Sequence, residues 1–140
     1  MRTVFVVDDH RLSADTLGDI LQSEGYNTCS FYSPFAVVEA AKTMPPDTLI
    51  TDFSMPGMDG LTLALCLRGQ NPGCNVIVIS GDVGAVRGHP ASHLFPVLEK
   101  PVEIAGLLSL ICSLDNHESE SSTICSADLP PSSFAEKHLL

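Results

Sequence analysis

The chain has 140 residues, of which 44% are hydrophobic, so it is long enough to bury the core of one domain. Its 17 acidic and 7 basic residues give a formal net charge of -10, which disfavours direct binding to nucleic acid or to an anionic membrane. The apolar runs fall far short of the roughly 20 residues of a membrane helix, and Asp8 and Asp9 interrupt the N-terminus where a signal peptide would continue. We therefore expect a cytoplasmic protein without membrane insertion or a direct nucleic-acid partner.

The cysteines argue against a disulfide framework or a zinc site. Their number, 5, is odd, and no two of them form a C-x-x-C pair. We interpret them as reduced thiols that are mostly packed in the fold.

The first half of the chain alternates short apolar runs with longer segments of helical periodicity, which indicates β-α-β units. Ala14, Leu17, Ile20 and Leu21 share one helical face, and Gly25 ends that helix. The remaining elements expected in this half are strands at residues 3–7 and 27–32 and a helix at 34–43, with Ser33 as N-cap and Pro34 at its first position.

The second half continues the alternation. We expect strands at residues 48–51, 75–79 and 97–98, and a helix at 60–68 capped by Asp59. Glycines and prolines crowd residues 81–96, so the helix in that segment is predicted to be short or irregular. A final helix is indicated by apolar residues at helical spacing, namely Ile104, Leu107, Leu108 and Ile111.

These elements predict a single α/β domain at residues 1–114, with a parallel sheet covered by helices on both faces. From Asp115 onward the composition shifts to Ser, Glu, Asp and Pro, so residues 115–140 are predicted to form a mostly disordered acidic and Ser-rich tail. No helix-turn-helix pattern or basic patch follows, so we expect signalling through protein contacts.

Polar residues follow four of the predicted strands. In an open α/β sheet, ligands bind outside the carboxyl ends of the strands, so these residues are expected to face one crevice. They are Asp8 and Asp9, Asp52, Ser80, and Glu99 with Lys100.

The chemistry of this set favours a divalent cation beside an anion. Carboxylates brought together repel one another unless a cation is present, and oxygen ligands at a partly hydrated site suit Mg2+. The Ser80 hydroxyl and the Lys100 ammonium group suit a phosphoryl group bound next to it. Taken singly, each residue could instead be a turn residue, a helix cap or a solvated charge.

The sequence resembles the receiver domain of bacterial two-component response regulators. The resemblance covers roughly residues 3–114 and rests on four motifs in the family's order. They are VVDD at residues 6–9, TDFSMPGMDG at 51–60, VISG at 78–81 and LEKP at 98–101. It implies a CheY-like, doubly wound five-stranded parallel sheet whose first strand lies between the second and third.

The resemblance also implies a role for each residue of the crevice. Asp52 would be the phosphoacceptor, Ser80 would bind a phosphoryl oxygen, and Lys100 would pair with it. Mg2+ would be held by Asp8, Asp9, Asp52 and the main-chain carbonyl of Ser54. The protein would be no enzyme in the usual sense, because it would catalyse only its own phosphorylation and dephosphorylation. Its partners would be a sensor histidine kinase or phosphotransfer protein and a downstream protein that the sequence does not identify.

Two departures from the family pattern affect the predicted switch. The family usually has Phe or Tyr three residues before the lysine, where this chain has Val97. Phe95 is interpreted as a buried residue at the entry of the last strand. The other departure is the glycine- and proline-rich segment at residues 81–96, which weakens the helix that often forms the output surface. His10, beside Asp9, is interpreted as a residue at the rim of the site.

Several functions remain open at this point. A receiver could be a chemotaxis-type messenger, a phosphorelay intermediate or a part of a larger hybrid kinase or regulator. The alternatives are a Mg2+-dependent phosphohydrolase of the haloacid dehalogenase type and a degenerate receiver that acts only as an interaction module. The phosphohydrolase class normally shows D-x-D at its nucleophile, whereas Asp52 is followed by Phe53 and Ser54.

Overall fold

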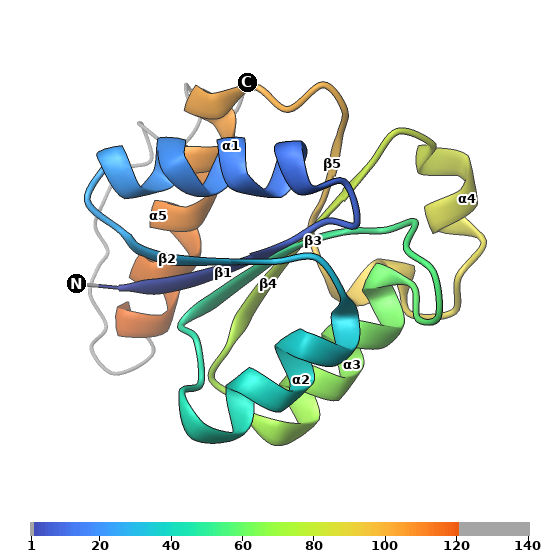
Figure 1. Ribbon diagram of the computed structural model, residues 1–140, viewed down its shortest axis with the longest axis horizontal. Helices are drawn as coiled ribbons and strands as arrows, with labels where there is room; N and C mark the ends of the chain where they lie inside the picture. The colour runs from blue at the N-terminus through green and yellow to red at the C-terminus, as the bar shows by residue number, and fades with distance from the viewer. Residues whose placement is uncertain (1, 121–140) are drawn as a thin grey trace. The chain divides into compact units, whose positions relative to one another are not determined.

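The computed structural model describes residues 2–120. Its described residues belong to two units, one that ends at Lys100 and one that begins at Pro101. The first unit contains five strands, four α-helices and a 3-10 turn in its described residues (Figure 1). In chain order they are β1 (Thr3–Val7), α1 (Arg11–Ser23), β2 (Asn27–Phe31), α2 (Pro34–Thr43), β3 (Thr48–Asp52), α3 (Gly60–Gln70), β4 (Asn75–Ser80), α4 (Val83–Arg87), the 3-10 turn η1 (Ser92–Leu94) and β5 (Val97–Glu99).

All strand pairs of the sheet are parallel, and their order is β2-β1-β3-β4-β5. The first strand therefore lies between the second and third, as the sequence analysis predicts. Chain order reverses at β1, because the chain moves outward to β2 and then returns past β1 to β3. Parallel pairing also brings the carboxyl ends of β1, β3 and β4 to one edge of the sheet.

Helices cover both faces of the sheet, with α1 on one face and α2 and α3 on the other (Figure 1). On the α2–α3 side, alternate strand residues such as Phe5, Leu49 and Val78 pack against the buried faces of the two helices. Intervening strand residues, for example Val6 and Ile50, are also fully buried. Burial on both faces explains why these strands are apolar without alternation.

The predicted helix caps are confirmed. Ser33 accepts a hydrogen bond from the Phe35 amide at 3.2 Å, and Pro34 occupies the first position of α2. The Asp59 carboxylate accepts the Thr62 amide at 2.8 Å and caps α3. Each cap satisfies a helix amide that has no partner within its own helix.

The helix between β4 and β5 is short, as predicted. Helix α4 has 5 residues, of which Val86 alone is buried, and η1 has no buried residue. Most of the residues between β4 and β5 are exposed to solvent.

The second unit contains α5 (Ile104–Glu120) in its described residues. This helix continues past Asp115, the first residue of the predicted tail, by more than one turn. Residues 121–140 of that tail lie outside the described residues, so the domain boundary after residue 114 stays a prediction. Within residues 2–120, no helix is both long and apolar enough to cross a membrane.

Candidate functional site

Two strands of the sheet centre place aspartates at its carboxyl edge. Asp52 is the last residue of β3 and pairs with Ile79 of β4, and Asp8 directly follows β1. Both are nearly enclosed, since Asp52 is 7% and Asp8 8% exposed. A carboxylate in such surroundings loses much of its hydration, so it needs a cation or hydrogen-bond donors nearby.

Lys100 supplies that cation. Its Nζ lies 2.9 Å from Oδ1 of Asp52 and 3.9 Å from Oδ2 of Asp8. The lysine is held in place by its own backbone, because its amide donates to the Ser80 carbonyl at 2.9 Å. The structure thus brings Asp8, Asp52 and Lys100 together, as the sequence analysis predicts.

The pKa values of this pair reflect burial and charge. Burial raises the pKa of Asp52, the hydrogen bond and charge of Lys100 oppose the rise, and the charges of Asp8 and Asp9 add to it. For Lys100, burial lowers the pKa, but the hydrogen bond to Asp52 and the three carboxylate charges outweigh burial and raise it. Lys100 therefore stays charged, while it offsets only part of the cost of burying a negative Asp52.

Asp9 and His10 extend the site toward solvent. Ligand atoms of Asp8, Asp9 and His10 all lie within 4.8 Å of one another. Asp8 is fixed on this side as well, since its Oδ1 accepts the His10 amide at 3.0 Å. The carboxylates of Asp8 and Asp9 can each offer an oxygen at the carboxyl edge of the sheet, and such a donor set fits a hydrated divalent cation.

The two serines of the predicted site differ in their contacts. Ser80 is the last residue of β4 and is 2% exposed. Its hydroxyl donates to the Asp82 carbonyl at 3.0 Å and accepts the Asp82 amide at 2.9 Å, so it closes the turn into α4. Ser54 lies exposed in the loop between β3 and α3. In this conformation, the Ser80 hydroxyl is occupied by the turn.

The loop from β3 to α3 returns tightly to the end of β3. The Gly60 amide donates to the Phe53 carbonyl at 2.8 Å, and a Cβ at Gly60 would lie 2.3 Å from the Asp52 carbonyl oxygen. Gly57 has φ +88°, a left-handed conformation that favours glycine. The two glycines let the loop close directly over the backbone of Asp52.

His89 joins this loop to the segment after α4. Its Nε2 lies 3.5 Å from the Asp59 carboxylate and 3.5 Å from the Thr62 hydroxyl. Its Nδ1 accepts the Ala91 amide at 3.0 Å, and Nε2 is the ring nitrogen that contacts Thr62 and Asp59. The ring also meets the Phe53 ring edge-on, with centroids 6.4 Å apart.

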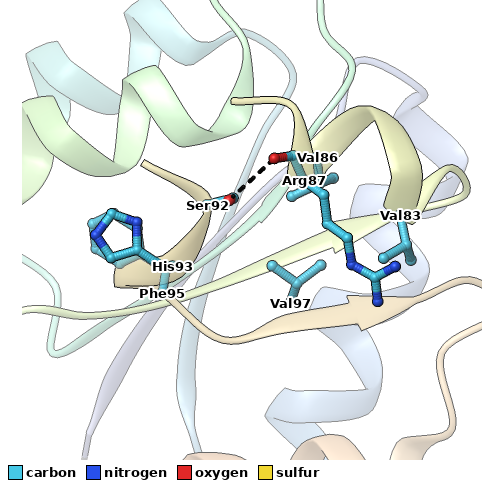
Figure 2. A pocket seen from close by; sticks show the side chains of 7 residues that line it. All are labelled: Val83, Val86, Arg87, Ser92, His93, Phe95 and Val97. Atoms are coloured by element: carbon cyan, nitrogen blue, oxygen red, sulfur yellow. Dashed lines mark hydrogen bonds between the residues drawn. The ribbon is translucent and has the colours of Figure 1, made fainter. Parts of the chain in front are cut away.

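A pocket of about 370 Å³ lies between α4, η1 and β5 (Figure 2). Val97 lines it from β5 and Val86 from α4, and the Ser92 hydroxyl donates to the Arg87 carbonyl at 3.5 Å. Phe95 is 6% exposed, as expected for a buried residue at the strand entry. The small Val97 side chain faces open space in this pocket.

Sequence reasoning recognised the strand-end residues but missed three contacts. It did not foresee the Ser80–Asp82 turn, the His89–Asp59 contact or the approach of Gly60 to Asp52. Of these, only Gly60 had a usable signal, because a glycine at the first position of a helix points to a close backbone approach rather than to helix propensity.

Comparisons with known proteins agree with this geometry. Residues 4–111 match the model of the response regulator receiver domain. The chain is 31% identical over 119 residues, 84% of its length, to the DNA-binding transcriptional regulator NtrC of Escherichia coli (strain K12). The match spans 25% of that relative, so this chain corresponds to about a quarter of it.

Solved structures show the same fold. A CheY-like receiver domain from Methylobacillus flagellatus has a TM-score of 0.74 and 26% identity, covering 81% of this chain and 98% of that one. The CheX-CheY-BeF3-Mg+2 complex from Borrelia burgdorferi has a TM-score of 0.70 and 25% identity, covering 81% and 89%. With its five-stranded parallel sheet, its edge of aspartates and its family match, the chain belongs to the receiver domains of two-component response regulators.

Proposed function

We propose that this receiver accepts a phosphoryl group on Asp52 from a phosphohistidine of a sensor kinase or phosphotransfer protein. The observation that carries the proposal is the 2.9 Å contact between Lys100 Nζ and Asp52 Oδ1 at the buried end of a central strand. It favours Asp52 over Asp8, because Lys100 lies closer to Asp52 and can stay at this site when the carboxylate bears a phosphoryl group.

The reaction would proceed by in-line displacement. An Asp52 oxygen bonds to phosphorus while the phosphorus–nitrogen bond of the donor histidine breaks, and the imidazole takes the electron pair of that bond. Lys100 would hold a phosphoryl oxygen, so positioning and electrostatics would provide most of the catalysis. The protein would act on no other substrate; it would catalyse only its own phosphorylation and the hydrolysis of the acyl phosphate.

We propose Asp8, Asp9, Asp52 and the Ser54 carbonyl as ligands of Mg2+, because oxygen donors of this kind suit that ion. Bound Mg2+ supplies positive charge that neutralises the transferring group and the carboxylates around it. The similar CheY of Borrelia burgdorferi was solved in a complex with BeF3 and Mg2+, and this supports the same assignment here.

We propose that the Ser80 hydroxyl binds the phosphoryl group once Asp52 is phosphorylated. The hydroxyl bonds to the Asp82 backbone in this conformation. A phosphoryl oxygen at Asp52 offers it a stronger, charged acceptor. Moving to that acceptor would open the turn into α4, and the protein contacts of residues 81–96 would change with it.

The phosphorylation proposal is tested by incubating the protein with acetyl phosphate and Mg2+ and mapping the label by mass spectrometry. Asp52→Asn should abolish labelling, and the exposed Asp19→Asn on α1 should leave it unchanged. Labelling of Asp52→Asn at another carboxylate would overturn the assignment. An unlabelled wild-type protein would instead favour a receiver that acts only as an interaction module.

The wider role is a proposal as well. From family membership we propose that a histidine kinase is the phosphoryl donor and that the protein is cytoplasmic. The acidic charge favours a protein as the downstream target. The family match favours this role over the phosphohydrolase alternative.

A further inference from the structure

The Asp8 carboxylate faces two different basic groups with its two oxygens. Oδ2 lies toward Lys100 at 3.9 Å, and Oδ1 lies 3.6 Å from Nδ1 of His10. The same Nδ1 is 3.8 Å from Oδ1 of Asp9. Lys100 thus lies near one oxygen of Asp8, and the His10 imidazole nitrogen lies near the other oxygen of Asp8 and near Asp9.

We propose that His10 is a third ligand, through Nδ1, for a divalent ion at Asp8 and Asp9, and that it gives this pair a preference for first-row transition ions over Mg2+. The proposal rests on the proposed function only in taking Asp8 and Asp9 as metal ligands. It adds a nitrogen ligand that the oxygen-only set lacks.

The distances suit such a set. Ligand atoms bound at about 2.1 Å and at right angles lie about 3.0 Å apart. The two His10 distances of 3.6 and 3.8 Å exceed that spacing by about 0.6 and 0.8 Å. Small side-chain rotations would close the gap, and Lys100 could keep Asp52 because it contacts the opposite oxygen of Asp8.

His10 is free to make this movement. Its side chain is 78% exposed, and although it occupies the N-cap position of α1, it makes no capping hydrogen bond there. Binding a metal therefore breaks no helix contact, and replacing the residue removes none.

The chemistry sets the expected selectivity. Affinity for a given site rises from Mn2+ through Co2+ to Ni2+, and imidazole suits the later ions, whereas Mg2+ prefers oxygen and water. The His10 nitrogen should therefore increase the affinity of the site mainly for Co2+ and Ni2+, and little for Mg2+.

The test measures Mg2+, Mn2+, Co2+ and Ni2+ binding by calorimetry at about pH 7.5. His10→Ala should weaken Ni2+ binding by about tenfold while changing Mg2+ binding by less than about twofold. His93→Ala, which removes another exposed histidine, is the matched control and should change neither. Asp9→Asn should weaken binding of all four ions.

A second readout locates the ion. Paramagnetic Co2+ should broaden amide signals of residues 8–12 in the wild type, and much less in His10→Ala. Equal Ni2+ affinities of wild type and His10→Ala would overturn the proposal, as would an equal loss in His93→Ala. Normal Asp52 labelling with no His10 effect would overturn this inference alone, whereas absent labelling with His10-dependent Ni2+ binding would overturn the phosphorylation proposal alone.

Discussion

The edge that carries Asp52 and the segment at residues 81–96 use the same β-α pattern but are packed differently. Helix α3, which follows β3, buries five residues, whereas α4, which follows β4, buries Val86 alone. The first region closes over Asp52 through Gly60, and the second borders a pocket beside Val97. Asp52 therefore lies on well-packed elements next to a loosely packed segment, where a change of conformation costs least.

Truncating a buried residue in each region tests this contrast most strongly. Leu63 of α3 is fully buried, so Leu63→Ala should lower the free energy of unfolding by about 2–5 kcal/mol. Val86→Ala should cost only about 1–2 kcal/mol, because the side chain is smaller and lines an open pocket. Urea denaturation measures both, and equal losses would contradict the difference in packing.

Adding a methyl group to a glycine probes the same contrast from the opposite direction. A Cβ at Gly60 would meet the Asp52 carbonyl at 2.3 Å, so Gly60→Ala should destabilise the protein by about 1–3 kcal/mol and impair Asp52 labelling. A Cβ at Gly81, between β4 and α4, would meet nothing within 4 Å, and Gly81→Ala should be neutral or stabilising by up to about 1 kcal/mol. A larger loss from Gly81→Ala than from Gly60→Ala would reverse the comparison.

The pH dependence of stability reports on the burial of Asp52. Its pKa is raised above the ordinary value of 3.8, so the folded state favours the protonated carboxyl. As pH rises above 3.8, Asp52 ionises in the unfolded chain while the folded state still holds its proton, so stability falls until pH passes the raised pKa. Asp52→Asn removes this penalty, so its stability relative to wild type should increase over that pH window.

Urea denaturation of wild type and Asp52→Asn at a series of pH values measures this effect. Asp19→Asn is the control, and its difference from wild type should stay constant. A gap that narrows as pH rises would mean that Lys100 more than compensates the burial of Asp52.

The smallest effect is expected at Val97. This side chain is half-buried and borders the pocket, so Val97→Ala should cost about 0.5–1 kcal/mol. A β-branched residue does not swing as an aromatic ring does, so beryllofluoride should change amide exchange mainly in residues 81–96 of both wild type and Val97→Ala. Loss of the response in Val97→Ala would show that Val97 itself transmits the change.

Much of this fold could be predicted from local patterns. The runs at residues 3–7 and 75–79 predict strands, and Asp59 before Gly60 predicts a capped helix, because periodicity and capping depend on neighbouring residues. The strand order came from the resemblance to receiver domains. The meeting of Asp8, Asp52 and Lys100 followed from the rule that strand ends share an edge.

Other contacts could not be predicted, for a physical reason. Whether the Ser80 hydroxyl turns to Asp82 or toward Asp52 is a choice between side-chain rotamers, and sequence spacing does not encode it. The His89–Asp59 contact joins residues 30 positions apart through an irregular segment whose path follows no periodic rule.

The contact of His89 with Asp59 has a consequence for how α3 begins. Asp59 uses one carboxylate oxygen both to cap α3 and to face the histidine ring. The first turn of α3 and the connection after α4 thus meet at one carboxylate oxygen. Any movement that withdraws His89 therefore changes the surroundings of the carboxylate that caps α3, which couples the start of this well-packed helix to the conformation of residues 81–96.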